Sequence, residues 1–150
     1  CCEVIQGTLQ TLPRSRAFDS IIYIDVLEHI EDHLAEFQRA HDRLSPGGHL
    51  MVLCPAHSFL FSPFDKSIGH FRRYNKRMFR ELSGKPPLAL EYLDCVGMAA
   101  SLANKLLMKQ SHPKKRQILL WDRLFVPASR ILDACTFRLL GKSILGVWRK

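Results

Sequence analysis

Three polar side chains follow an apolar run at the point where the run ends. The run is Ser20–Ile24, and Asp25, Glu28 and His29 come directly after it. A carboxylate or an imidazole beside a bound substrate can orient a hydroxyl group or remove its proton near neutral pH. Glu28 and His29 are therefore candidate catalytic residues. The alternative is structural: Glu28 caps a neighbouring helix and His29 only packs.

A second group of polar candidates lies in the connecting segment 57–74, among several aromatic residues. The group consists of His70, Arg72, Arg73 and Tyr74. Guanidinium groups bind carboxylates and phosphates through paired hydrogen bonds, and connections of this length often close over a ligand. We expect His70 to take part in the chemistry and all four residues to contact the substrate. The alternative is a scaffold, in which Arg72 pairs with Asp65 and Tyr74 caps the next helix.

Neither a metal site nor disulfides are expected from the sequence. His29 and His33 are four residues apart, but a zinc-protease helix needs Glu directly after the first histidine, where Ile30 stands. No third ligand follows at a matching spacing, so we expect no metal. The five cysteines are odd in number and form no C-x-x-C pair, which favours reduced thiols in a cytoplasmic protein.

Two strands and a helix must position the first group. Ser20–Ile24 and Leu50–Cys54 are apolar and of strand length. Between them, apolar and aromatic residues recur at helical spacing: Ile30, Leu34, Phe37, His41 and Leu44. Asp32 can cap the start of this helix, and the sequence from Ser45 to Gly48 ends it. Such a unit is parallel and right-handed, and ligands of open α/β sheets bind beyond the carboxyl ends of the strands.

Further elements complete an α/β domain covering residues 1–150. We expect strands at 1–5, 88–95 and 142–148, and helices at 75–83, 98–108 and 118–140, the last broken at Pro127. Residues 109–117 form a basic linker within the domain. No run of about twenty apolar residues is present to cross a membrane.

Several of these stretches resemble one enzyme family. The D-V-L-E-H-I turn at 25–30, the L-S-P-G-G sequence at 44–48 and D-K-S-I-G-H-F-R-R-Y at 65–74 are similar to segments of class I S-adenosylmethionine-dependent methyltransferases of the type 11 and type 12 small-molecule branch. The resemblance implies a Rossmann-like, mostly parallel sheet whose last strand is antiparallel. It also implies S-adenosyl-L-methionine as the cofactor and methyl transfer by positioning and in-line displacement.

The resemblance also assigns cofactor contacts to this chain. Thr8 and Leu9 stand where similar proteins hold the adenine ring with a G-D-L sequence, and Asp25, Val26 and His29 stand near the amino-acid end of the cofactor. No glycine-rich cofactor loop precedes them. We therefore expect the carboxyl-terminal portion of a methyltransferase, truncated at the amino end, with an exposed sheet edge open to a homodimer or a completing chain.

The charge is concentrated in the last part of the chain. Residues 1–108 contain 12 Lys+Arg and 12 Asp+Glu, whereas residues 109–150 contain 10 and 2, which accounts for the whole net charge of +8. A small-molecule or lipid-linked acceptor is expected, with peripheral membrane contact through 109–140 at the inner membrane face. Two other readings stay open: a non-catalytic accessory chain of the same fold, and a basic nucleic-acid or membrane-surface binder, of which nucleic-acid binding is less favoured.

Overall fold

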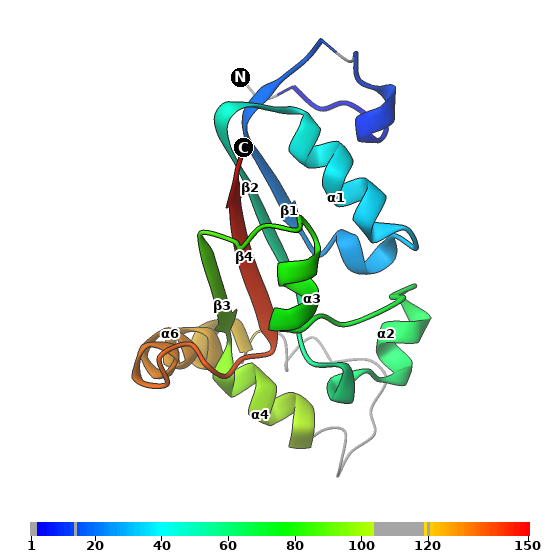
Figure 1. Cartoon of the computed structure of the whole chain (residues 1–150). Coiled ribbons are helices and arrows are strands. Elements are labelled where there is room, and N and C mark those ends of the chain that lie inside the picture. Colours follow the sequence, from blue (N-terminus) through cyan, green and yellow to red (C-terminus); the bar gives the residue numbers. More distant parts are fainter. Residues whose placement is uncertain (1–2, 14, 104–118, 120) are drawn as a thin grey trace.

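The centre of the protein is a four-stranded sheet in the order β1-β2-β4-β3. The computed structural model describes residues 3–13, 15–103, 119 and 121–150. The strands are β1 (Phe18–Ile24), β2 (Leu44–Pro55), β3 (Ala89–Leu93) and β4 (Ser143–Arg149), shown in Figure 1. β1 pairs with β2 in parallel, and β4 runs antiparallel to both of its neighbours, β2 and β3. The predicted α/β sheet with an antiparallel last strand is confirmed.

The predicted strand–helix–strand unit is also present. Helix α1 (His33–Asp42) connects β1 to β2, and Asp32 caps it by accepting a hydrogen bond from the amide of Ala35 at 3.1 Å. β2 begins at Leu44 rather than at Leu50, because the proline–glycine sequence continues as an irregular start of the strand. Gly48 lies so close to β1 that a Cβ there would be 3.0 Å from the carbonyl oxygen of Asp19.

Two helices cover the same face of the sheet. The ring of Phe37 on α1 packs edge-on against Trp148 of β4, with 4.8 Å between ring centroids. Phe79, on helix α3 (Lys76–Glu81), packs against the same tryptophan at 5.6 Å. As predicted, Asn75 caps α3, since its side chain accepts a hydrogen bond from the amide of Met78. Phe37 and Phe79 are fully buried and tie α1, α3 and the sheet into one core.

The buried side of α1 is rotated from the predicted one. Leu34 is 50% exposed, whereas Phe37 and Ala40 are fully buried. Successive helical residues are turned by about 100°, so a stripe centred on Phe37, Ala40 and Leu44 leaves Leu34 at its margin. The prediction that Leu34 belongs to the core was wrong for this reason.

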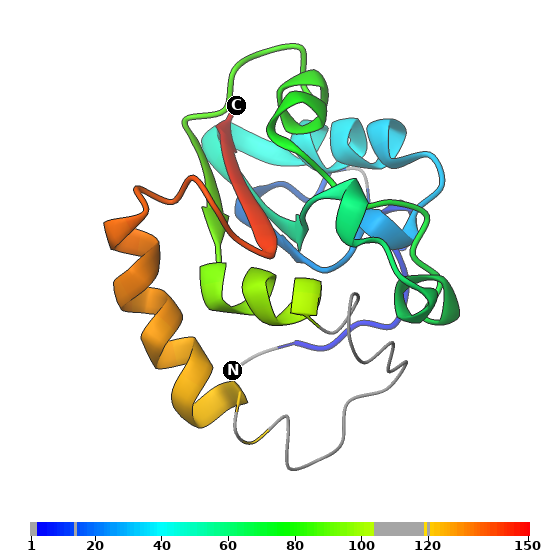
Figure 2. The ribbon, with the colours of Figure 1, turned by 90° about the horizontal axis from the view of Figure 1, so that it is seen from below.

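Two further helices lie beyond the carboxyl end of β3. Helix α4 (Cys95–Ala103) packs against α6 (Val126–Cys135), which follows a π-helical turn, η5 (Trp121–Phe125); Figure 2 shows α4 and α6 side by side. The buried carboxylate of Asp133 accepts hydrogen bonds from the amides of Asp94 and Cys95, at 2.7 and 2.8 Å, and so caps α4. The predicted break near Pro127 is confirmed, but the helix ends at Cys135 instead of Leu140.

Some of the other predicted elements are present in the structure and some are not. The predicted strand at 88–95 corresponds to β3, but residues 3–6 form no strand. Segment 57–74 is not a plain loop, because it contains the short helices η3 (Ser58–Leu60) and α2 (Pro63–Ser67). The short helices η1 (Leu9–Thr11) and η2 (Leu27–His29) were not predicted. The basic linker at 109–117 and the end of the helix predicted at 98–108 lie outside the described residues.

Two features of the described structure bear on possible membrane and protein partners. No helix in the described part of the chain is long and apolar enough to cross a membrane. β1 is an edge strand of the sheet, and its Ile22 and Ile24 are 58% and 59% exposed. An exposed edge was predicted, and pairing of a second chain along it stays a prediction.

Replacing Phe37 by alanine tests the role of the aromatic core. We expect Phe37→Ala to lower the free energy of unfolding by about 3–5 kcal/mol, because it removes a fully buried ring and leaves a cavity against Trp148. Leu34→Ala, on the exposed margin of the same helix, is the control and should change it by less than about 1 kcal/mol. Urea denaturation monitored by tryptophan fluorescence measures both, and equal losses would contradict the assignment of the core.

Candidate active site

A residue with an unusual backbone conformation follows each of three strands. Asp25 after β1, His57 after β2 and Asp94 after β3 have φ angles of 52°, 63° and 66°. Residues other than glycine rarely adopt positive φ, and when the surrounding structure holds them there, they cluster at functional sites. All three follow the carboxyl ends of β1, β2 and β3, which run in the same direction in the sheet (Figure 1). This is the edge at which the sequence predicted a ligand site.

The structure brings the candidate catalytic residues together at this edge. Glu28 and His29 lie on η2, directly after β1, and the amide of Phe71 donates a hydrogen bond to the carbonyl oxygen of Glu28 at 2.8 Å. This contact places His70 beside both residues. The rings of His29 and His70 meet edge-to-face with centroids 4.5 Å apart, and Nε2 of His70 lies 3.9 Å from Oε1 of Glu28. Their catalytic roles stay a prediction.

Glu28 is the most unusual member of this group. Its side chain is fully buried, and neither carboxylate oxygen has a hydrogen-bond partner of good geometry among the described residues. Burial raises the pKa of Glu28, and its backbone and the nearby Cys54 thiol oppose the shift without cancelling it. Buried polar groups are nearly always satisfied, so an orphaned carboxyl group beside two histidines indicates a functional site.

His70 is held in place by a buried ion pair. Its Nδ1 lies 3.0 Å from Asp65 Oδ1, and Asp65 also receives hydrogen bonds from Arg73 at 2.9 and 3.0 Å. Burial alone would raise the pKa of Asp65, but the hydrogen bonds from Arg73 and Ser62 outweigh it and lower that pKa below its usual value. The ionised carboxylate is an acceptor for the Nδ1–H of His70, and in the neutral imidazole this tautomer has Nε2 as an acceptor facing Glu28.

The other predicted substrate residues make internal contacts. Arg72 donates hydrogen bonds to the carbonyl oxygens of Ile30 and Glu31, and the fully buried Tyr74 donates from its hydroxyl to Leu27 at 3.2 Å. Arg73 is 8% exposed and pairs with Asp65, whereas the structural alternative considered from the sequence paired Arg72 with Asp65. Substrate binding by these three side chains stays a prediction, but each has a structural role in the fold.

Three of the predicted cofactor residues share a cavity. Thr8, Leu9 and Val26 line a hollow of about 680 Å³, together with apolar and aromatic residues that include Phe18 and Ile30 and with four charged residues. The hydroxyl of Thr8 also caps η1 by accepting a hydrogen bond from the amide of Gln10. The predicted contacts Asp25 and His29 are not among the lining residues, so the structure separates the five predicted cofactor residues into two groups.

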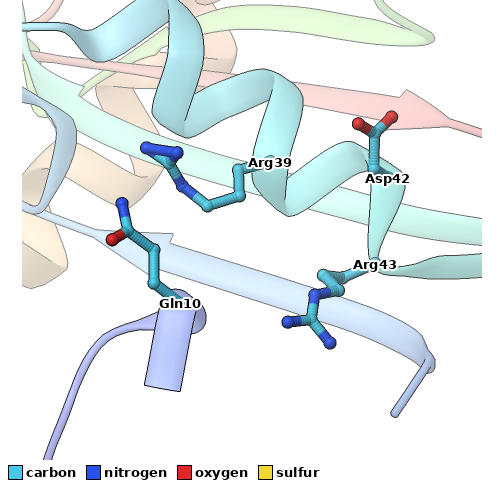
Figure 3. Close-up of a pocket in the computed structure, with 4 residues that line it drawn as sticks. All are labelled: Gln10, Arg39, Asp42 and Arg43. Carbon is cyan, nitrogen blue, oxygen red and sulfur yellow. The ribbon is translucent and has the colours of Figure 1, made fainter. Parts of the chain in front are cut away.

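A second hollow, of about 550 Å³, adjoins the first at the other end of the sheet. Figure 3 shows it between Gln10 on η1 and the residues Arg39, Asp42 and Arg43 at the end of α1. The guanidinium group of Arg43 donates to the carbonyl oxygens of Leu9, Leu12 and Pro13 and so holds the η1 segment against the helix. The carbonyl of Arg43 binds the amide of Phe18, at the start of β1, which places this hollow away from the His70 group.

Two features of the site were not predicted from the sequence. His29 was compared with His33, but His33 packs against Tyr74 with ring centroids 5.5 Å apart, and His29 instead meets His70, which is far along the chain. Asp65 was also not recognised as the partner of His70. The five-residue spacing of Asp65 and His70 around Gly69, whose φ is 82°, is the signal that could have indicated this contact.

Comparison with known proteins assigns the chain to a family. Residues 4–93 match the sequence profile of a family described as a methyltransferase domain. This match covers more than half of the 150 residues, so the chain belongs to that family. The expected membership of the class I methyltransferases, and with it a family of enzymes, is confirmed. No curated protein matched the sequence.

Solved structures agree on the fold. Phosphoethanolamine N-methyltransferase 2 of Haemonchus contortus, in complex with S-adenosyl-L-methionine, superposes with a TM-score of 0.51 at 17% identity, over 93% of this chain and 34% of that one. A putative sarcosine dimethylglycine methyltransferase from Galdieria sulphuraria gives 0.54 at 17%, over 95% and 56%. The [4+2]-cyclase SpnF gives 0.53 at 16%, over 96% and 54%. The chain thus spans about a third to a half of these proteins.

Removing the charge of Asp65 tests the buried ion pair that holds His70 in place. We expect Asp65→Asn to lower the free energy of unfolding by about 3 kcal/mol at pH 7, because Arg73 is left as a buried charge without a counterion. The pKa of Asp65 is lowered in the folded state, so its contribution is present above its unfolded pKa of about 3.9 and is lost as the pH falls further. The difference in the free energy of unfolding between Asp65→Asn and the unaltered chain should therefore shrink below about pH 4.

The control for this experiment is Glu81→Gln. Glu81 pairs with Arg77 at 3.6 Å on α3, and both side chains are largely exposed. Its replacement should change the free energy of unfolding by less than about 0.5 kcal/mol at either pH. Denaturant titrations at pH 7 and at about pH 2–3, below the unfolded pKa of Asp65, measure both variants. A loss for Asp65→Asn at pH 7 as small as the control's would contradict the structural role of the buried pair.

Proposed function

We propose that this chain forms part of an S-adenosyl-L-methionine-dependent methyltransferase that acts on a small-molecule or lipid-linked acceptor. One observation carries the proposal: the turn after β1 contributes to two neighbouring sites at once. Val26 lines the apolar cavity, and Glu28, two residues later, belongs to the polar group with His29 and His70. A donor site and an acceptor site on the two sides of one turn are what group transfer between two small molecules requires.

The cavity fits the donor in size and chemistry. Its volume of about 680 Å³ is within the usual range for ligand pockets, roughly 300–1,000 Å³. Leu9, Val26 and Phe18 offer apolar surface to an adenine ring, and Thr8 offers a hydroxyl. When bound, S-adenosyl-L-methionine supplies an activated methyl group and its own leaving group. The chain therefore needs mainly to hold two reactants in line.

The polar group suits the acceptor. A lone pair on an oxygen or nitrogen of the acceptor forms the new bond to the methyl carbon as the carbon–sulfur bond breaks, and the acceptor loses a proton. Nε2 of His70 carries a free lone pair and faces Glu28, so this wall of the site can orient an acceptor hydroxyl and receive its proton. Removing an acceptor proton in this way contributes typically about 10²–10⁴-fold to rate.

Surface chemistry supports a lipid-linked acceptor and peripheral membrane contact. Helix α6, the preceding η5 and the turn after α6 expose large apolar side chains in the described part of segment 109–140: Leu124, Val126, Ile131, Leu132, Phe137, Leu139 and Leu140. Ile131 is 69% exposed and lies next to Arg130. Apolar side chains beside arginine are suited to the boundary of an anionic membrane.

Cofactor binding is tested by filling the cavity. We expect S-adenosyl-L-methionine to bind the chain, and Val26→Trp to weaken binding at least tenfold, about 1.4 kcal/mol, because the larger side chain occupies the hollow. Val26 is half-buried, so the fold should tolerate the change. The control is Leu124→Trp, at a site 57% exposed on η5. Isothermal titration calorimetry measures all three, and no binding by the unaltered chain would favour the accessory-chain alternative.

Membrane contact is tested with vesicles of equal parts phosphatidylglycerol and phosphatidylcholine. We expect the chain to sediment with them at low salt, and Ile131→Asp to reduce the bound fraction at least about fivefold, since it places a charge in the apolar surface. Leu88→Asp, 66% exposed but remote from α6 in the sequence, is the control. Equal binding by both variants would exclude α6 as the contact surface.

A further inference from the structure

The group of Glu28, His29 and His70 has the composition of a metal site. One carboxylate oxygen and two imidazole nitrogens, one atom from each residue, all lie within 4.8 Å of one another. We propose that these three side chains bind a divalent first-row transition-metal ion such as Mn²⁺, Fe²⁺, Co²⁺ or Zn²⁺. Two imidazoles and one carboxylate form a well-known facial ligand set for such ions, with the remaining positions open. This inference replaces the expectation of no metal.

The spacing requires only a small adjustment. Ligand atoms at about 2.0–2.2 Å from a metal ion lie roughly 3–3.5 Å apart, so the group must contract. Oε1 of Glu28 and Nε2 of His70 are already within 3.9 Å. His29 is exposed, so its ring can turn toward the other two without disturbing the core. Glu28 and His70 must therefore approach each other by less than about 1 Å, and the remaining movement falls on His29, which is free to move.

Glu28 provides a second and independent indication. Its carboxyl group is fully buried, and apart from the weak thiol donor of Cys54 neither oxygen has a hydrogen-bond partner among the described residues. An unsatisfied buried carboxylate is costly unless a cation or a set of donors compensates it. A metal ion at the centre of the group would coordinate one of these oxygens and balance its charge.

His70 is already oriented as a ligand. Metal-binding histidines usually donate their second ring N–H to a carboxylate, which fixes the ring and increases its basicity. Asp65 accepts from Nδ1 of His70 at 3.0 Å, and Arg73 neutralises Asp65 through two hydrogen bonds. Nε2 is the nitrogen left for the metal. Arg73 also holds the Asp65 carboxylate in position, so that the carboxylate can accept a hydrogen bond from Nδ1 of His70.

The ligand set favours transition metals over Mg²⁺ and Ca²⁺. These two hard cations prefer oxygen ligands, whereas two of the three ligands here are imidazoles. Three protein ligands leave positions open, and the exposure of His29 shows that solvent reaches the site. This role rests on the proposed function: an acceptor oxygen coordinated at an open position would have a lower pKa and, because Nε2 of His70 would then bind the metal, would release its proton to solvent water before attack on the methyl carbon.

Metal binding is tested on the full chain, stripped with a chelator and dialysed. CoCl₂ is added, and its visible absorption reports coordination by nitrogen and oxygen; ZnCl₂ is titrated calorimetrically. We expect a single site, and we expect Glu28→Gln, His29→Gln and His70→Gln each to weaken binding at least tenfold, with His29→Gln the most informative because its exposed side chain is not needed for folding. The control is His49→Gln, a half-buried histidine in β2, which should bind like the unaltered chain.

Three outcomes would overturn the inference: no binding of either ion at millimolar concentration, binding unchanged by His29→Gln, or equal losses in His49→Gln. Circular dichroism of each variant separates loss of the site from loss of the fold. Calorimetry with S-adenosyl-L-methionine on the same metal-free preparation distinguishes this inference from the proposed function. Cofactor binding without metal binding rejects only the metal site, and metal binding without cofactor binding rejects only the proposed function.

Discussion

Hydrogen bonds between the turn after β1 and the segment 71–74 hold the whole candidate site together. The carbonyl oxygen of Leu27 accepts one hydrogen bond from the amide of Ile30 within η2, and those of Glu28 and Glu31 lie in the irregular turn outside any regular helix. The hydroxyl of Tyr74, the amide of Phe71 and the guanidinium of Arg72 satisfy them. Buried carbonyl groups without partners are costly, so this arrangement is specified by the backbone of the turn itself. His70 reaches Glu28 because its neighbours in sequence are needed there.

The same contacts explain how far the sequence could predict the structure. The parallel unit around α1, the caps Asp32 and Asn75 and the antiparallel last strand follow from local patterns, and the structure contains all of them. Local patterns do not show which way a charged side chain points. Arg72, Arg73 and Tyr74 were expected to face a substrate, yet their polar atoms satisfy groups of the chain itself.

The pairing of His29 with His70 shows the same limit of local sequence patterns. A helix places residues i and i+4 on one face, so His29 was compared with His33 as a possible pair of metal ligands. In the structure η2 ends at His29 and α1 begins at His33, so the two residues belong to different elements. The true neighbour, His70, comes from a segment whose position depends on the turn contacts. No spacing rule within one helix could have identified that pair.

The conformation of Asp25 connects these observations. At a φ of 52° the chain leaves the direction of β1 immediately, and such a conformation costs of order 1–3 kcal/mol in a residue other than glycine. The amide of Asp25 still binds the carbonyl of Leu53 on β2, so the strand pairing continues up to the bend. Beyond it, Val26 lines the apolar cavity while Glu28 enters the polar group. An extended residue at position 25 would continue the strand direction and would not divide the following residues between the two sites. The strain at Asp25 is thus the local cost of placing the cavity and the polar group on either side of a single turn.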